Sequence, residues 1–228
     1  MPPGYVRARP RSSGTDNPRV LIRAATPADE SALYDVCLRT GAEGEDATGA
    51  YTDPRLLGHI YVGPYLALEP DLAFVLDDGQ PAGYVLGARD TMEFDRRCER
   101  EWWPTLRNRY PDPPVGRPWT PDERLEHMIH HPPRLDRMLL AEYPAHLHID
   151  LLPRAQGAGH GRRLITHLLQ ELRTMGAAGV HLVTGVQNRR AIAFYDRIGF
   201  RTLQTNLDAV VMAMRLRSSG GSSTSPDG

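Results

Sequence analysis

The clearest chemical signal in the chain is a glycine-rich turn at residues 156–162, QGAGHGR. It follows an apolar run and precedes residues 162–175, where leucine and isoleucine recur at helical spacing. Glycines allow a ligand to approach the backbone, and the first N–H groups of a helix have no partner within it. Together with the positive end of the helix dipole, such a turn can bind an anion, most often a pyrophosphate. Turns of this kind also occur without a ligand, and this one matches neither the P-loop nor the dinucleotide-binding pattern.

A second group of chemically capable residues lies just before the turn. His146, His148 and Asp150 alternate with apolar residues in the run 145–152, which predicts a strand with all three on one face. Titratable groups on a central strand are costly unless they are satisfied or used. One of them, or a water molecule, could take a proton from an attacking nucleophile. A purely structural role is the alternative for each.

Other candidates carry weaker signals. His127, His130 and His131 precede two prolines, but no spacing of histidine, cysteine and carboxylate matches a zinc pattern, so we expect no metal site. Cys37 and Cys98 lie in no nucleophile motif and cannot form a disulfide framework. The chain contains no lysine, which excludes Schiff-base chemistry by a lysine of its own.

The elements around these residues predict one mixed α/β domain. Strands are expected at 20–24, 72–77, 82–88, 145–152, 180–186, 200–203 and 209–216. Helices are expected from Pro27 to Gly41 and at 92–109, 120–130, 134–142, 162–175 and 188–198. An acidic, glycine-rich loop at 41–55 follows the first helix, and its carboxylates could attract an amine. The pattern favours an α/β (α+β) fold around one central sheet flanked by helices.

Length and composition set further limits. The 228 residues, 40% hydrophobic and 24% charged, fit a single domain at 19–217 between disordered tails at 1–18 and 218–228. Residues 91–143 carry all three tryptophans and are expected to be a helical insertion before the central strand. A net charge of −1 argues against a nucleic-acid partner, and no apolar run is long enough for a membrane span. The N-terminus has no secretory pattern, so we expect a cytoplasmic protein. Its oligomeric state is open, a homodimer included.

Two motifs resemble one known superfamily. The spacing of Gln156, Gly159 and Gly161 resembles the acyl-CoA-binding motif of the GNAT acetyltransferases. Downstream, residues 188–200 (NRRAIAFYDRIGF) are similar to the N-x-x-A-x-x-F-Y-x-x-x-G-F signature of the same superfamily. The resemblance covers roughly residues 20–216 and implies a GNAT-type mixed sheet.

A narrower resemblance points within that superfamily. Tyr34, Cys37, Thr40, the stretch 72–87 and Ile149-Asp150 are similar to the acetyltransferase-like C-terminal domain of O-GlcNAcase. That domain departs from the acyl-CoA motif in its glycines, whereas this chain keeps them. The resemblance therefore implies a stand-alone, bacterial-type relative that can bind acetyl-CoA.

The resemblance also implies roles for individual residues. Tyr195 would protonate the leaving thiolate, and Asp150 or His148 would act in proton transfer, the His-Leu-His run being similar to a strand of serotonin N-acetyltransferase. Residues expected to contact acetyl-CoA are Leu151, Leu152, Gln156, Gly157, Ala158, Gly159, His160, Gly161, Arg162, Asn188 and Tyr195. Leu151 and Leu152 would offer backbone groups to the pantetheine arm, and Asn188 its side-chain amide.

These roles imply an acetyl-CoA-dependent N-acetyltransferase. It would transfer the acetyl group directly, in a ternary complex, to a primary amine of a small molecule or a peptide. The alternative is a pseudo-acetyltransferase that binds acetyl-CoA as a sensor or interaction module without turnover. The identity of the acceptor is not encoded in any motif of the sequence.

Overall fold

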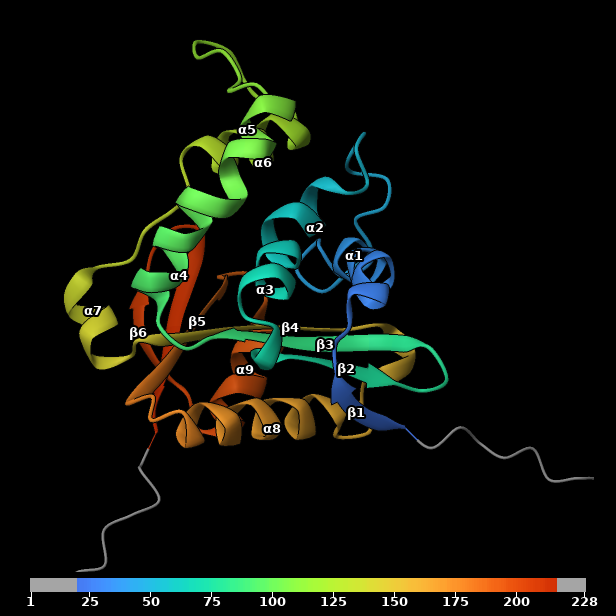
Figure 1. Ribbon diagram of the computed structural model, residues 1–228, viewed down its shortest axis with the longest axis vertical. Coiled ribbons are helices and arrows are strands. Elements are labelled where there is room, and N and C mark those ends of the chain that lie inside the picture. Colours follow the sequence, from blue (N-terminus) through green and yellow to red (C-terminus); the bar gives the residue numbers. More distant parts are fainter. Residues whose placement is uncertain (1–19, 217–228) are drawn as a thin grey trace, which may run out of the picture.

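A seven-stranded sheet forms the centre of the computed structural model, which describes residues 20–216 (Figure 1). The strands are β1 (Leu21–Ala24), β2 (Ala73–Asp77), β3 (Pro81–Ala88), β4 (Ala145–Leu151), β5 (Gly179–Gly185), β6 (Arg201–Thr205) and β7 (Ala209–Arg215). Their order across the sheet is β1-β2-β3-β4-β5-β7-β6, and every neighbouring pair is antiparallel except β4 and β5. The predicted mixed sheet flanked by helices is confirmed. The predicted tails at 1–18 and 218–228 lie outside the described residues.

Helices cover both faces of the sheet. Figure 1 shows α1 (Glu30–Leu38), α2 (Leu56–Tyr61) and α3 (Gly63–Leu68) over one face. On the opposite face lie α8 (His160–Thr174) and α9 (Arg189–Ile198). The sheet therefore has a core on each side, as its alternating side chains require.

The core under α8 follows directly from the helical pattern of the sequence. Leu164, Ile165, Leu168 and Leu172 are all 0% exposed and pack against inward-facing residues of β2, β3, β4 and β5. Each such side chain contributes roughly 1.5–3 kcal/mol through burial. This packing fixes the position of α8, which begins after residues 152–159 that connect it to the end of β4.

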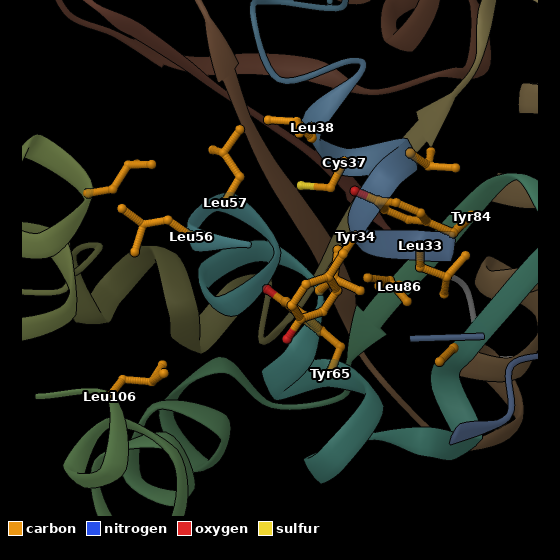
Figure 2. Packing of buried hydrophobic residues seen from close by; sticks show 14 of the residues in the cluster. Leu33, Tyr34, Cys37, Leu38, Leu56, Leu57, Tyr65, Tyr84, Leu86 and Leu106 are labelled. Atoms are coloured by element: carbon orange, nitrogen blue, oxygen red, sulfur yellow. The ribbon is translucent and has the colours of Figure 1, made fainter. Parts of the chain in front are cut away.

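The core under α1–α3 is shown in Figure 2. Tyr84 and Leu86 of β3 project into it and pack against Leu33 and Cys37 of α1. Tyr84 is fully buried. The second wall of this core, formed by α2 and α3, was not predicted from the sequence.

α2 and α3 could not be predicted from the sequence because they contain glycine and proline, which are typical of helix breaks. Gly58 lies flat against the ring of Tyr34, since a Cβ atom there would be 2.3 Å from the ring carbons. A Cβ on Gly63 would likewise overlap Trp102 at 2.4 Å. The glycines that look like helix breakers are therefore required for close packing of the helices.

The segment between β3 and β4 is helical, as predicted. It contains α4 (Thr91–Arg97), a π-helical turn (Cys98–Trp102), α5 (Trp103–Arg109), α6 (Pro121–His130) and α7 (Arg137–Glu142). Figure 1 shows α4–α6 rising above the sheet beside α2 and α3. A capping box of Thr120 and Glu123 starts α6. None of the helices within residues 20–216 combines the length and apolar character needed to cross a bilayer.

Candidate functional site

The sheet opens between β4 and β5. These parallel strands pair only at Ala145–Val180 and His146–His181, near their first residues. β4 continues to Leu151 and β5 to Gly185 without further pairing. Leu152, just after β4, donates its N–H to the Ala82 carbonyl of β3. Backbone groups of successive strand residues point to opposite sides, so the even-numbered residues of β4 bond to β3 and the odd-numbered residues direct their N–H and C=O groups toward the opening.

A cavity of about 780 Å³ occupies this opening. Its lining includes β4 residues 147–151, the turn 156–162, the end of β5 and the first turns of α9. The loop after α1 closes another side with Thr40, Ala42, Glu43, Gly44 and Glu45. Segments far apart in the sequence thus meet at one concave site, which is typical of a ligand-binding pocket.

The glycine-rich turn forms an anion-binding surface in this cavity. Gly157 and Gly159 have φ values of +83° and +79°, a region that favours glycine, and a Cβ on either would meet nothing within 4 Å. The backbone N–H groups of residues 157–162 bond to no acceptor within residues 20–216. They lie at the N-terminus of α8, a helix of 15 residues. Free N–H groups and the helix dipole together favour a bound anion.

Asp150 faces the cavity from β4 with an unusual environment. Burial raises the pKa of its carboxyl group to about 7, although the hydroxyls of Tyr84 and Thr40 act in the opposite direction. Tyr84 donates a hydrogen bond of 2.5 Å to Asp150 Oδ2. A carboxyl group with a pKa near 7 can act as a general base at neutral pH.

The two histidines of β4 have different environments in the structure. His146 is buried, and its ring nitrogens lie 2.7 Å from Tyr65 Oη and 2.7 Å from Thr91 Oγ1. Both nitrogens are therefore occupied by the fold. His148 lines the cavity instead, beside the rings of Tyr61 and Tyr65. Burial lowers the pKa of His148 to about 4, so its imidazole is neutral at pH 7.

Tyr195 and Asn188 reach the same cavity from α9. Tyr195 is 8% exposed and lines the cavity, and burial together with Asp150 raises the pKa of its hydroxyl. The phenol is therefore protonated at neutral pH. Asn188 caps α9 by accepting a hydrogen bond of 3.0 Å from the Ala191 N–H. Its amide nitrogen is left for another partner, next to Gly44 of the loop.

The structure corrects one predicted contact and refines two others. Leu152 donates its N–H to Ala82, so this N–H is not available to a ligand, and its carbonyl already accepts a hydrogen bond from Ala155. It also does not line the cavity, whereas Leu151 does. The Leu151 carbonyl accepts 2.7 Å from Gln156 Nε2, which leaves its N–H as the free group. The side chain of Ala158 is exposed outside the cavity lining, so only its N–H can contribute.

Several residues that line the cavity or support its side chains were not identified from the sequence. Tyr84 holds Asp150, and only the β3–β4 register, which pairs the two residues, reveals that contact. Three further cations line the cavity from α9 in addition to Arg162 of α8. They are Arg189, Arg190 and Arg197. Arg189 and Arg190 lie eight and seven residues before Arg197 in the predicted helix 188–198, and this helical spacing is the signal that could have found them.

Comparisons with known proteins agree with this geometry. The acetyltransferase (GNAT) family model matches residues 42–200. The crystal structure of SsHAT is 41% identical with a TM-score of 0.81, covering 88% of this chain and 100% of that one. A GNAT superfamily phosphinothricin acetyltransferase from Sinorhizobium meliloti, in complex with acetyl-CoA, has the same fold at 14% identity and a TM-score of 0.53, over 91% and 93% of the two chains.

One curated relative is much longer than this chain. The O-GlcNAcase of Rattus norvegicus is 26% identical over 180 residues, which make up 78% of this chain and 20% of the relative. The chain thus spans about a fifth of that protein, in keeping with the predicted similarity to one of its domains. The family match and the SsHAT similarity identify the chain as a member of the acetyltransferase (GNAT) family, whose cosubstrate is acetyl-CoA.

Proposed function

We propose that the protein transfers an acetyl group directly from acetyl-CoA to a primary amine, with Asp150 as general base and Tyr195 as general acid. The observation that carries this proposal is that a carboxyl group with a pKa of about 7 and a protonated phenol line the same cavity. Proton removal from the amine and proton delivery to the leaving group need these two functions.

The cavity residues fit the cosubstrate. The free N–H groups of the 157–162 turn, with Arg162 beside them, can hold a pyrophosphate. The free N–H of Leu151 and the amide of Asn188 lie along the opening, where they can bond to the amides of an extended arm. Acetyl-CoA supplies the acetyl group as an activated thioester.

The protein's own groups then handle the protons. Asp150, when ionised, takes a proton from the attacking amine nitrogen as the new C–N bond forms and the C–S bond breaks. Tyr195 donates its phenolic proton to the sulfur that leaves. Neutral His148 stands beside this path and can orient the amine or a water molecule.

An acyl-enzyme is not part of this proposal. Cys37 and Cys98 are both buried, and burial raises the pKa of each thiol to about 12. A thiol with such a pKa is protonated at pH 7 and is a poor nucleophile. The state of these two thiols supports direct transfer within a ternary complex.

The charges of the cavity favour an acceptor that is itself a cation. The arginines lie along α8 and α9, whereas Glu43 and Glu45 line the cavity from the loop after α1. An anionic cosubstrate is attracted to the first side and a positively charged amine to the second. A diamine or the amino group of a basic peptide meets this description.

Release of CoA in the presence of different amines tests both parts of the proposal. We expect turnover with a diamine or a basic peptide at lower KM than with a neutral amine such as a monoalkylamine. Glu43→Gln with Glu45→Gln should raise the KM of the cationic acceptor roughly three- to tenfold, because exposed charges contribute about 1 kcal/mol or less each. Asp46→Asn, a change in the same loop outside the cavity lining, serves as the control.

Calorimetric titration of acetyl-CoA separates an enzyme from a binding module. Gly159→Asp places a carboxylate among the N–H groups and should abolish binding. Binding to the wild type without CoA release from any amine would identify a pseudo-acetyltransferase. Absence of binding to a folded wild-type protein would contradict the proposed cosubstrate site.

A further inference from the structure

Three side chains converge at the joint between α5 and α6, outside the cavity described above. Asp112 lies in the proline-rich segment after α5, His127 in the last turn of α6, and His131 at the C-terminal cap of that helix. His127 Nδ1 is 3.0 Å from Asp112 Oδ1, and His131 Nε2 is 2.6 Å from Asp112 Oδ2. One ligand atom from each residue lies within 4.8 Å of the other two.

We propose that Asp112, His127 and His131 bind a divalent transition-metal ion, with Zn²⁺ the best match. Two imidazoles and one carboxylate are a common zinc ligand set, with bond lengths of about 2.0–2.2 Å. Tetrahedral ligands at that distance are separated by roughly 3.3 Å. Side-chain movements of less than about 1 Å would therefore admit the ion among these atoms. Imidazole ligands favour Zn²⁺, Cu²⁺ or Ni²⁺ over Mg²⁺ or Ca²⁺.

The two histidines are preorganised for chelation. They are four positions apart at the C-terminal end of α6, His131 being its cap residue, which places them on the same face. Their ring centroids are 4.2 Å apart. The ring of Trp119 packs on His127 at 4.4 Å, and its Nε1 donates to the Pro114 carbonyl at 2.8 Å. This packing restricts the orientation of one ligand ring before any ion binds.

The remaining coordination is open to solvent. Asp112 and His131 are exposed and His127 is partly buried, so an ion can enter without opening the core. A water molecule would complete a tetrahedron. The neighbouring His130 lies outside this group of three, and its Nε2 is 2.7 Å from the Tyr110 carbonyl oxygen.

The position of the site defines what the ion would do. It would link the segment after α5 to the end of α6 and close the loop between residues 112 and 127. The start of α6 is already tied to the loop before α2, since Asp122 accepts hydrogen bonds from the Thr52 and Asp53 N–H groups. A bound ion would therefore stabilise the helical segment beside α2. Asp112, His127 and His131 do not line the cavity at β4 and β5, so the metal site does not depend on the proposed function.

Titration of ZnCl₂ into the chelator-stripped full-length protein tests the proposal. Calorimetry should give one ion per chain, and Zn²⁺ should raise the melting temperature. Asp112→Asn, which keeps the size and the hydrogen-bonding oxygen, and His131→Ala should each weaken binding at least tenfold. His130→Gln, next to the site on the same helix, should bind as the wild type does.

The intrinsic fluorescence of the protein gives an independent reading. Ni²⁺ or Cu²⁺ at the site should quench Trp119, and Trp119→Phe should remove the quenched component while keeping the binding. No stoichiometric Zn²⁺ binding by the wild type would overturn the proposal and leave the cluster as a hydrogen-bonded joint. Equal binding by the wild type, Asp112→Asn and His131→Ala would place the ion elsewhere and overturn it as well.

Discussion

Asp150→Asn should strongly slow acetyl transfer and at the same time stabilise the folded protein. The asparagine keeps the shape of the side chain, and its carbonyl oxygen can accept the hydrogen bond from Tyr84. It cannot take a proton from an amine, so the proposed base is lost. Because general-base catalysis contributes about 10²–10⁴-fold, the turnover rate should fall by that factor.

The stability gain follows from the raised pKa of Asp150. The pKa is 3.8 for an unperturbed aspartate and about 7 in the folded protein, so the native state holds a proton that the unfolded chain releases. The wild type therefore loses stability as pH rises from about 4 to 7, and no further above 7. A difference of about three pH units corresponds to roughly 4 kcal/mol. The stability of Asp150→Asn relative to the wild type should rise by up to this amount over the same range.

Urea denaturation of both proteins between pH 4.5 and 8.5 measures this difference. Asp46→Asn is the control, because hydrogen bonds from Thr48 lower the pKa of the exposed Asp46 and so place its titration below this pH range. The stability difference between that variant and the wild type should therefore stay constant from pH 4.5 to 8.5. The wild-type rate should also rise with pH and level off above about 7. A pH-independent stability difference, or a rate profile without this titration in the wild type, would refute the assignment of Asp150.

Three further substitutions test other parts of the structure. Tyr84→Phe removes the donor that stabilises ionised Asp150, so the midpoint of the pH–rate profile should move up by roughly 1–2 pH units, in line with about 1.5–3 kcal/mol for a charged hydrogen bond; an unchanged midpoint would exclude this coupling. Tyr195→Phe should lower kcat by about 10²–10⁴-fold while calorimetry shows unchanged acetyl-CoA affinity, and full activity would exclude Tyr195 as the acid. Leu168→Ala, at a 0% exposed position under the sheet, should lower the free energy of unfolding measured in urea by about 2–5 kcal/mol. A smaller decrease would mean that neighbouring side chains move into the space left by the leucine.

The sequence predicted the parts of the molecule that depend on local patterns. The period of the leucines in 162–175 placed the main helix, which runs from His160 to Thr174. The alternation in 145–152 placed His146, His148 and Asp150 on one face of β4, as the β3–β4 register shows. These features could be predicted because side chains on one helix face or one strand face repeat at fixed intervals.

Helix packing could not be predicted in the same way. In the sequence, Gly58 and Gly63 are typical of helix breaks, but in the structure they allow α2 to lie against Tyr34 and α3 against Trp102. The local sequence does not distinguish a glycine that permits close packing from a glycine that ends a helix. Only the neighbouring element distinguishes them.

The chemistry of the site was also decided by tertiary structure. The sequence left both His148 and Asp150 as candidates for the general base. In the structure, burial under α1–α3 raises the pKa of Asp150 and lowers the pKa of His148. The two pKa values move in opposite directions because burial disfavours the charged form of each group, which is the ionised carboxylate and the protonated imidazole. The convergence of Asp112 on His127 and His131 likewise depends on how the proline-rich segment folds back on α6.

The sequence by itself therefore determined the succession of strands and helices along the chain except for α2 and α3, the glycine-rich turn, and the motif residues Asn188 and Tyr195. Each of these depends on residues close together in the chain. The tertiary structure decided where β4 and β5 separate, which side chain of β4 is free to react, and which distant carboxylates and arginines share the cavity. Those features arise from contacts between residues far apart in sequence, whose burial and distance no local pattern specifies.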